Sequence, residues 1–314
     1  MSVIAGDIGG TKTLLRCVES SGAISAETRF DSARYRTFDD LLREFIPFCS
    51  APIEAACFAV AGPVLASRAE VTNLKWLIDS AELQRGFGIP HVELINDFFA
   101  VALGVPLLGP ADLVSLQQGT RDRGAPIAIL GAGTGLGEAM VTRHRDEWVV
   151  IPSEGGHADF APQDEEQMRL LAALQKKYGH VSWERVISGM GLTNIYEFLA
   201  GRREDPAGIA ELARSGDDTA VRTFEIFVDI YGAEAGNAAL RVLARGGVFL
   251  AGGVAAKNQP FFTDGRFMAA FLRKGRFVEL LREMPVDLIV NEHVGLIGAA
   301  ARAKAEGRGH KAEG

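Results

Sequence analysis

The sequence is poor in cysteine. Its 314 residues include three cysteines, Cys17, Cys49 and Cys57, and no Cys-x-x-Cys pair. An odd count without paired spacing argues against a disulfide framework and against a cysteine-rich zinc site. Free thiols are typical of reducing compartments, so we expect a cytoplasmic protein.

The sequence also lacks long hydrophobic runs and an excess of positive charge. Gly, Pro or charged residues interrupt every apolar stretch well before the ~18 residues that suggest a membrane span. The first ten residues, MSVIAGDIGG, have no cationic segment of the kind that opens a secretory signal. With 33 basic and 40 acidic residues the net charge is −7, so neither nucleic acid nor an acidic membrane is an expected partner.

The remaining composition is that of a globular protein. Hydrophobic residues make up 47% and charged residues 23% of the chain. A chain of this length predicts roughly two domains of about 150 residues each. An anionic substrate would have to be bound by backbone N–H groups or by a few local cations.

Two segments share one plan, in which an apolar strand, a glycine-rich turn and a second strand follow each other. The first is Ser2–Ala5 with GDIGGTK and TLLRCVES, and the second is PIAIL (126–130) with GAGTGLG and EAMVTR. Each predicts a hairpin around its turn. The repeated plan indicates two lobes related by an ancient duplication.

The glycine turns have two interpretations. Neither matches a P-loop or the dinucleotide fingerprint, because a strand and not a helix is expected after each turn. They could be tight hairpins alone, or their N–H groups could form nests for phosphate. A third glycine turn, Ala251-Gly252-Gly253, ends the apolar segment GGVFLAGGV (246–254). Three such turns, each after an apolar strand, favour a nucleotide-binding cleft.

The segment HVELINDFFA (91–100) places Asn96 and Asp97 between apolar neighbours. We expect a strand over Val92–Ile95 and a helix over Phe98–Leu103, so both polar residues lie where a strand ends. Open α/β sheets bind ligands at such ends. Asp97 could instead be the N-cap of the following helix.

Other segments predict a strand over Ala55–Val60 and several helices. The helices are expected over Phe38–Phe48, Ser80–Phe87 with Ser80 as N-cap, Glu165–Tyr178, Glu184–Ser188 and Asp217–Leu243. Five histidines show no ligand spacing and are interpreted as structural or surface residues: His91, His144, His180, His293 and His310.

Together these motifs resemble the bacterial glucokinase family, within the hexokinase–actin–Hsp70 superfamily. The phosphate and adenosine segments of that superfamily resemble Asp7-Ile-Gly-Gly-Thr11, Gly131-Ala-Gly-Thr-Gly-Leu-Gly137 and Ala251-Gly-Gly-Val254. The pieces specific to glucokinases resemble LINDF (94–98), EGGHADFAP (154–162), HVSWERVISG (180–189) and VGLIGAA (294–300). The resemblance covers nearly the whole chain, and the order of these pieces is highly specific.

The resemblance implies an α/β protein with a two-lobe, ribonuclease-H-like (actin-like ATPase) fold and a central cleft. The small lobe would comprise residues 1–107 and 298–314, and the large lobe residues 108–297. The last helix, Leu296–Lys304, would return to the small lobe. The implied reaction is phosphorylation of D-glucose by ATP with Mg²⁺, giving glucose 6-phosphate, and the implied assembly is a homodimer.

The resemblance also implies roles for individual residues. Asp97 would be the general base. The sugar would be bound by Asn96, Asp97, Glu154, His157 and Glu184. The nucleotide would be bound by Gly6, Asp7, Ile8, Gly9, Gly10, Thr11, Gly133, Thr134, Gly135, Gly252 and Gly253.

Some features leave alternatives open. Lys12 follows GGT where the family commonly has Asn, and Ser153 precedes Glu154 where it often has Gly. The chain has no cysteine-rich zinc loop after its Glu-x-Gly-His, which argues against a zinc-containing repressor. A kinase for another hexose, a non-catalytic sugar sensor and an actin-like filament protein remain alternatives.

Overall fold

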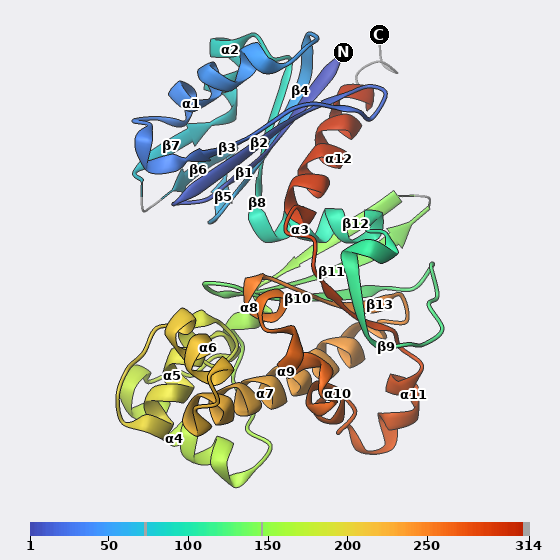
Figure 1. Cartoon of the computed structure of the whole chain (residues 1–314). Helices are drawn as coiled ribbons and strands as arrows, with labels where there is room; N and C mark the ends of the chain where they lie inside the picture. The colour runs from blue at the N-terminus through green and yellow to red at the C-terminus, as the bar shows by residue number, and fades with distance from the viewer. Residues whose placement is uncertain (72–73, 146, 310–314) are drawn as a thin grey trace. The chain divides into compact units, whose positions relative to one another are not determined.

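The structure is a computed structural model that describes residues 1–71, 74–145 and 147–309 (Figure 1). His310, interpreted above as a surface residue, lies outside them. The chain divides into two compact units, Met1–Leu108 with the C-terminal segment from His293, and Gly109–Glu292. Each contains a mixed sheet and helices, which confirms the α/β class. No helix in the described part of the chain is long and apolar enough to cross a bilayer.

The first unit is built on a five-stranded sheet of order β3-β2-β1-β4-β8. Strands β1 (Ser2–Ile8), β2 (Lys12–Glu19) and β3 (Ile24–Asp31) form an antiparallel meander. Strands β4 (Ile53–Val60) and β8 (His91–Asn96) run parallel to β1. The hairpin predicted around the first glycine turn is confirmed, and the carboxyl ends of β1, β4 and β8 lie at one edge.

Alternate residues of β1 enter two separate cores. Ile4 and Ile8 pack with α1 (Phe38–Phe45) and α2 (Ser80–Phe87). Val3 and Ala5 pack with α3 (Asp97–Gly104) and α12 (Val294–Gly309) on the opposite face of the sheet. These two helices approach closely, since a Cβ on Gly298 would lie 1.9 Å from Ala100 O. The lobe boundary expected at residue 298 falls inside α12, because this helix begins at Val294.

Two local predictions in the first unit need correction. The N-cap of α2 is Asp79 and not Ser80, because the Asp79 carboxylate accepts from Ala81 N and Glu82 N. The helix expected over Phe38–Phe48 ends at Phe45, and a 3-10 turn, Ile46–Phe48, follows because Pro47 has no N–H to continue the helix. The alternative in which Asp97 caps the following helix is excluded, because Asn96 is the N-cap of α3. A small sheet of β5 (Val64–Leu65), β6 (Arg68–Val71) and β7 (Trp76–Asp79) completes this unit.

The second unit is built on a six-stranded sheet of order β12-β11-β10-β13-β14-β9. Strands β10 (Ile127–Ala132), β13 (Gly247–Ala251) and β14 (Val286–Ile289) are parallel, and β11 (Leu136–His144), β12 (Glu147–Ser153) and β9 (Leu113–Gln117) run antiparallel to their neighbours. The β10–β11 hairpin repeats that of β1 and β2, as the sequence predicted.

Helices pack beneath this sheet around α7 (Asp218–Val242), whose side chains enter the same core as Leu130 and Leu250 (Figure 1). The helix α4 is confirmed at Glu165–Tyr178, and Asp217 caps α7. The helix expected over Glu184–Ser188 is wrong. That segment overlaps a 3-10 turn, Trp183–Arg185, and Ser188 caps α5 (Gly189–Ala200) by accepting from Gly191 N. Shorter helices complete the unit: α6 (Pro206–Arg214), α8 (Gly253–Lys257), α9 (Gln259–Thr263), α10 (Arg266–Phe271) and α11 (Val278–Arg282).

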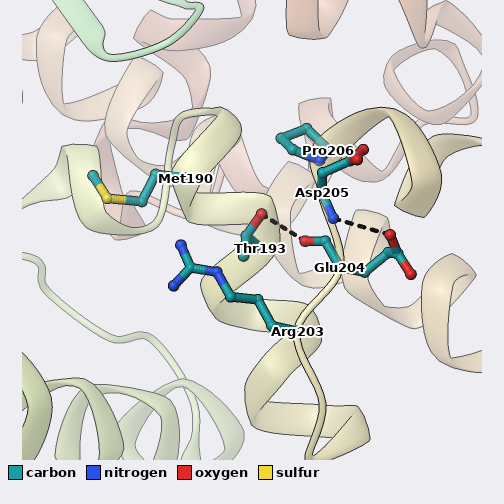
Figure 2. Close-up of a pocket in the computed structure, with 6 residues that line it drawn as sticks. All are labelled: Met190, Thr193, Arg203, Glu204, Asp205 and Pro206. Atoms are coloured by element: carbon teal, nitrogen blue, oxygen red, sulfur yellow. Dashed lines mark hydrogen bonds between the residues drawn. The ribbon is translucent and has the colours of Figure 1, made fainter.

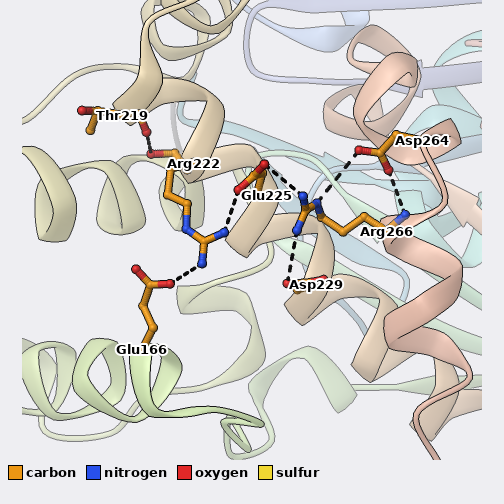
Figure 3. A network of polar contacts seen from close by, with 8 residues as sticks. Glu166, Thr219, Arg222, Glu225, Asp229, Asp264 and Arg266 are labelled. Carbon is orange, nitrogen blue, oxygen red and sulfur yellow. Dashed lines mark hydrogen bonds and ion pairs between the residues drawn. The ribbon is translucent and has the colours of Figure 1, made fainter.

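An ion-pair network connects α4, α7 and α10 (Figure 3). Arg222 on α7 pairs with Glu166 on α4 and, at 2.6 Å, with Glu225 one turn along its own helix. Arg266 on α10 donates to the other oxygen of Glu225 at 2.9 Å and lies 3.9 Å from Asp229. Glu225 therefore joins two arginines from different helices.

We expect Arg266→Met to lower the free energy of unfolding by about 1–2 kcal/mol, because Glu225 and Asp229 lose a charged donor. Urea denaturation of both proteins gives this difference. Arg282→Met is the matched control. Arg282 pairs with Glu279 at 3.8 Å in an exposed position, so its loss should cost less than about 0.5 kcal/mol. Equal effects of the two substitutions would contradict a stabilising role for the network.

Candidate functional site

The turn between β1 and β2 is a tight hairpin in which Gly9 N donates to Lys12 O at 3.0 Å. A strand follows the turn, which confirms that it is not a P-loop. Thr11 and Lys12 are exposed, whereas Gly6 and Ile8 face the core. A Cβ on Gly6 would lie 2.6 Å from the Phe58 ring, so packing alone explains this glycine.

Asp7 alternates with Gly6 and Ile8 along β1 and faces the side of the sheet that carries α3 and α12. Its surroundings raise its pKa to about 6, first through burial and then through the negative charge of Asp97, while His293 opposes the shift. Asp7, Asp97 and His293 thus lie within electrostatic reach of one another. Sequence reasoning missed His293, since a lone histidine at the start of a helix carries no ligand spacing.

Asn96 and Asp97 have distinct roles at the end of β8. The Asn96 side-chain oxygen accepts from Phe98 N at 2.9 Å and from Phe99 N at 3.1 Å, and its amide nitrogen donates to Gly62 O at 3.2 Å. Its extended backbone suits an N-cap. Asp97 is the first residue of α3 and is half-buried. Capping therefore does not account for the carboxylate of Asp97.

Burial raises the pKa of Asp97, and the hydrogen bond from Phe98 N to its carboxylate, at 2.8 Å, opposes the shift. A half-buried carboxylate with a second one nearby is costly to keep ionised. Such carboxylates are typical of sites that accept or release protons.

The glycine turn of the second unit is held by contacts on two sides. Gly133 O accepts from Gly189 N at 2.8 Å, which joins the turn to the start of α5. Gly252, at φ 89°, directly follows β13. It lies so close to the end of β10 that a Cβ there would be 2.2 Å from Ala132 O. The turn over residues 133–135 and the glycines Gly252 and Gly253 are therefore neighbours, as a shared nucleotide site requires.

Glu184 contacts the same glycine turn. Its carboxylate accepts from Leu136 N at 3.0 Å, and a Cβ on Gly135 would lie 2.4 Å from the same oxygen. The 3-10 turn that carries Glu184 is fixed because Trp183 N donates to Ala158 O at 3.0 Å. The sequence predicted Glu184 as a sugar ligand but gave no sign of its bond to the turn.

Glu154 and His157 lie on a second 3-10 turn, Gly155–His157, directly after β12. Both side chains are exposed, and Glu154 Oε2 lies 3.8 Å from His157 Nε2. Gly156 lets this turn lie against β11, since a Cβ there would meet Leu136 O at 2.3 Å. The turn that carries Glu154 and His157, and the carboxylate of Glu184, thus both approach the backbone of Leu136.

A hollow of about 560 Å³ opens beside α5 and the start of α6 (Figure 2). Its walls are formed by Met190, Thr193, Arg203, Glu204, Asp205 and Pro206. Thr193 donates to Glu204 O at 2.9 Å, which fixes the chain between the two helices. The lining of the hollow begins at Met190, directly after Gly189, whose N–H donates to Gly133 O. Sequence reasoning missed these residues because they belong to no recognised motif.

No group of three or more His, Cys, Asp or Glu side chains among the described residues is arranged to hold a metal ion. Mg²⁺ often needs only one or two carboxylates, with the remaining ligands from phosphates and water. Asp7, beside the first glycine turn, fits that requirement.

Comparisons of sequence and structure identify known proteins that are similar to this chain. The model of the glucokinase family matches residues 4–306. A glucokinase from Nostoc punctiforme is 41% identical over 95% of this chain and 97% of its own. The crystal structure of a glucokinase from an Antarctic psychrotroph has a TM-score of 0.87 and 31% identity, covering 97% and 99% of the two chains. A ROK family glucokinase from Streptomyces griseus, solved with glucose and AMPPNP, shares the fold with a TM-score of 0.66 at 22% identity, over 97% of this chain and all of its own.

We expect Asn96→Ala to lower the free energy of unfolding by about 1 kcal/mol, because α3 loses its N-cap. Asn96→Ser keeps an uncharged acceptor oxygen for the first turn of α3 and should be more stable than Asn96→Ala. Thermal denaturation of both variants checks this. If Asn96→Ala were as stable as Asn96→Ser, the capping assignment would be wrong.

Proposed function

The chain belongs to the glucokinase family, and we propose that it transfers the γ-phosphoryl group of ATP to the 6-hydroxyl of D-glucose. The products are ADP and glucose 6-phosphate. The observation that carries the proposal is the family relationship over nearly the whole chain, including every glucokinase-specific piece of its sequence. The half-buried Asp97 at the carboxyl end of β8 supplies the group that such a reaction needs.

Asp97 is the proposed general base. Phosphoryl transfer depends mainly on positioning and charge stabilisation, with a carboxylate that orients and deprotonates the attacking hydroxyl. As the sugar oxygen bonds to the γ-phosphorus, its proton passes to Asp97 and the bond to the β-phosphate oxygen breaks. The raised pKa of Asp97 supports this role, because a base works best when its pKa approaches the working pH.

The proposed sugar ligands are Asn96, Asp97, Glu154, His157 and Glu184. Carboxylates, amides and imidazoles suit a neutral sugar because they accept from or donate to its hydroxyls. The Asn96 oxygen caps α3, one of its amide N–H groups donates to Gly62 O, and its side chain also hydrogen-bonds the Asp97 carboxylate, so Asn96 orients Asp97 at the proposed sugar site. One carboxylate oxygen of Glu184 accepts from Leu136 N, and this bond orients the other oxygen toward the proposed sugar.

The proposed nucleotide site contains the turns at Asp7–Thr11 and Gly133–Gly135, together with Gly252 and Gly253. Glycine backbones approach phosphate closely and offer N–H donors. The hollow beside Gly189 is the candidate place for the base of the nucleotide, because Gly189 N bonds the phosphate turn itself. Gly6 and Ile8 act through packing of β1 in this proposal.

Mg²⁺ is the proposed metal, and Asp7 would face it. Mg²⁺ bound to the phosphates neutralises charge that develops during transfer. Asp7 lies in a buried setting and near Asp97, so a cation there would also relieve the repulsion between the two carboxylates.

The finer features of the family stay part of the proposal: a ribonuclease-H-like architecture with a central cleft between two lobes, a homodimer, and a cytoplasmic location. Another hexose as substrate is the main alternative. A coupled ADP assay with a panel of hexoses, and with ATP and sugar each omitted in turn, tests the proposal. Absence of glucose-dependent ADP release from folded protein would overturn it and leave a sugar sensor as the better interpretation.

We expect Asp97→Asn to lower kcat at least about a hundredfold, the lower range for a positioned acid–base group. The free energy of unfolding should change little, because Asn96 and not Asp97 caps α3. Steady-state kinetics and thermal denaturation check the two parts. Near-normal turnover, or an unfolded protein, would show that Asp97 has another role.

We expect Gly133→Val to weaken ATP binding without loss of stability. A Cβ there meets none of the described atoms within 4 Å, and Gly133 is not among the residues with positive φ. Its side chain would instead occupy the space proposed for phosphate. Gly124→Val, at an exposed turn, is the control for calorimetric titration with ATP. Gly135→Val is unsuitable because its Cβ would collide with Glu184. Unchanged ATP affinity in Gly133→Val would remove this turn from the nucleotide site.

A further inference from the structure

A buried carboxylate lies directly beneath the turn that carries Glu154 and His157. Glu138 is on β11, paired in register with Ser153 at the end of β12. Its side chain is 7% exposed. A Cβ built on Gly155 would lie 2.1 Å from Glu138 Oε2, so the carboxylate fills the space beside that glycine.

Glu138 shares its surroundings with a second buried acid. Glu234 on α7 is fully buried and is bonded by Arg241 at 2.6 Å and by Asn237 at 2.8 Å. Arg241 also lies 3.6 Å from Glu138 Oε2. One guanidinium therefore serves two carboxylates and makes its closer contact with Glu234.

The other oxygen of Glu138, Oε1, is buried and has no hydrogen-bond partner among the described residues. A buried ionised oxygen without a donor is costly, whereas a protonated carboxyl costs less. Burial, and then the charge of Glu234, raise the pKa of Glu138 to about 7, against the pull of Arg241. The proposed reaction uses neither Glu138 nor Glu234.

We propose that Glu138 is a positioning residue for the turn over residues 154–157, and that gain or loss of its proton adjusts glucose binding near neutral pH. The inference rests on the proposed sugar role of Glu154 and His157. Protonated Glu138 packs against Gly155 and holds the turn. Ionised Glu138 needs a donor for Oε1, and admitting water to the turn would supply one and loosen that packing.

The charged and titratable groups around Glu138 come from three elements. On α7 they are Glu234, Arg241 and the hydroxyl of Tyr231, which donates to Leu130 O. Lys274 contacts Asn237 at 2.6 Å, beyond Glu234. On the turn itself, Glu154 and His157 point outward and are exposed. Glu234 is the neighbouring charge with the largest effect on the pKa of Glu138, so its removal should shift the titration of Glu138.

The test measures KM for glucose and for ATP from pH 6 to pH 8. In the parent protein we expect KM for glucose to rise about threefold or more as Glu138 ionises. Glu138→Gln, which mimics the protonated group, should lack the rise that is due to Glu138, and its kcat and KM for ATP should equal those of the parent protein at each pH. Glu234→Gln removes the neighbouring charge, so the rise should occur at lower pH. Glu147→Gln, at an exposed position on β12, is the control and should behave like the parent protein.

Three outcomes would overturn the inference. The first is a KM profile for glucose in Glu138→Gln that matches the parent protein, and the second is a change in KM for ATP as large as that for glucose. The third is a midpoint in Glu234→Gln at the same pH as in the parent protein. Hydrogen exchange of the peptide covering residues 153–160 gives a readout that does not need turnover. After correction for the intrinsic rate, the parent protein should lose protection between pH 6 and pH 8 and Glu138→Gln should not. This result separates failure of the Glu138 inference from failure of the proposed reaction, which absence of glucose-dependent ADP release would show.

Discussion

The hydrogen bond from Gly189 N to Gly133 O is the contact on which the candidate site of the second unit depends. It fixes the start of α5 against the glycine turn, and α5 forms one wall of the hollow. The same turn receives Glu184 through Leu136 N. Residues proposed for sugar and for nucleotide are thus attached to one short piece of backbone, so movement of that turn would change both sets together.

Close backbone contact makes this arrangement possible. Gly252 lies against Ala132 O and Gly156 against Leu136 O, at distances that no side chain could accept. Each glycine lets a segment from a distant part of the sequence lie beside the β10–β11 hairpin. The absence of a Cβ at these glycines is therefore what allows the segments to come together.

Both units contain buried carboxylates whose ionisation carries an electrostatic cost. Asp7 and Asp97 lie near each other in the first unit, and Glu138 and Glu234 in the second. Such pairs lower stability unless each carboxylate has its own cation. Their position beside the glycine turn of β1 and beneath the turn of Glu154 places this cost where ligands are proposed to bind.

Strand and helix periodicity, with the glycine turns and the family motifs, determined from sequence the α/β class, both hairpins, α4 and the strand–helix junction at Asp97. Those features depend on neighbours along the chain. Sequence alone could not decide that Asn96 and not Asp97 caps α3, since either side chain can accept the N–H groups of a first turn. It also could not reveal the bond from Leu136 N to Glu184 or the position of Glu138 beneath Gly155. Such contacts join residues far apart in the sequence, and only the packing of strands and helices brings them within reach.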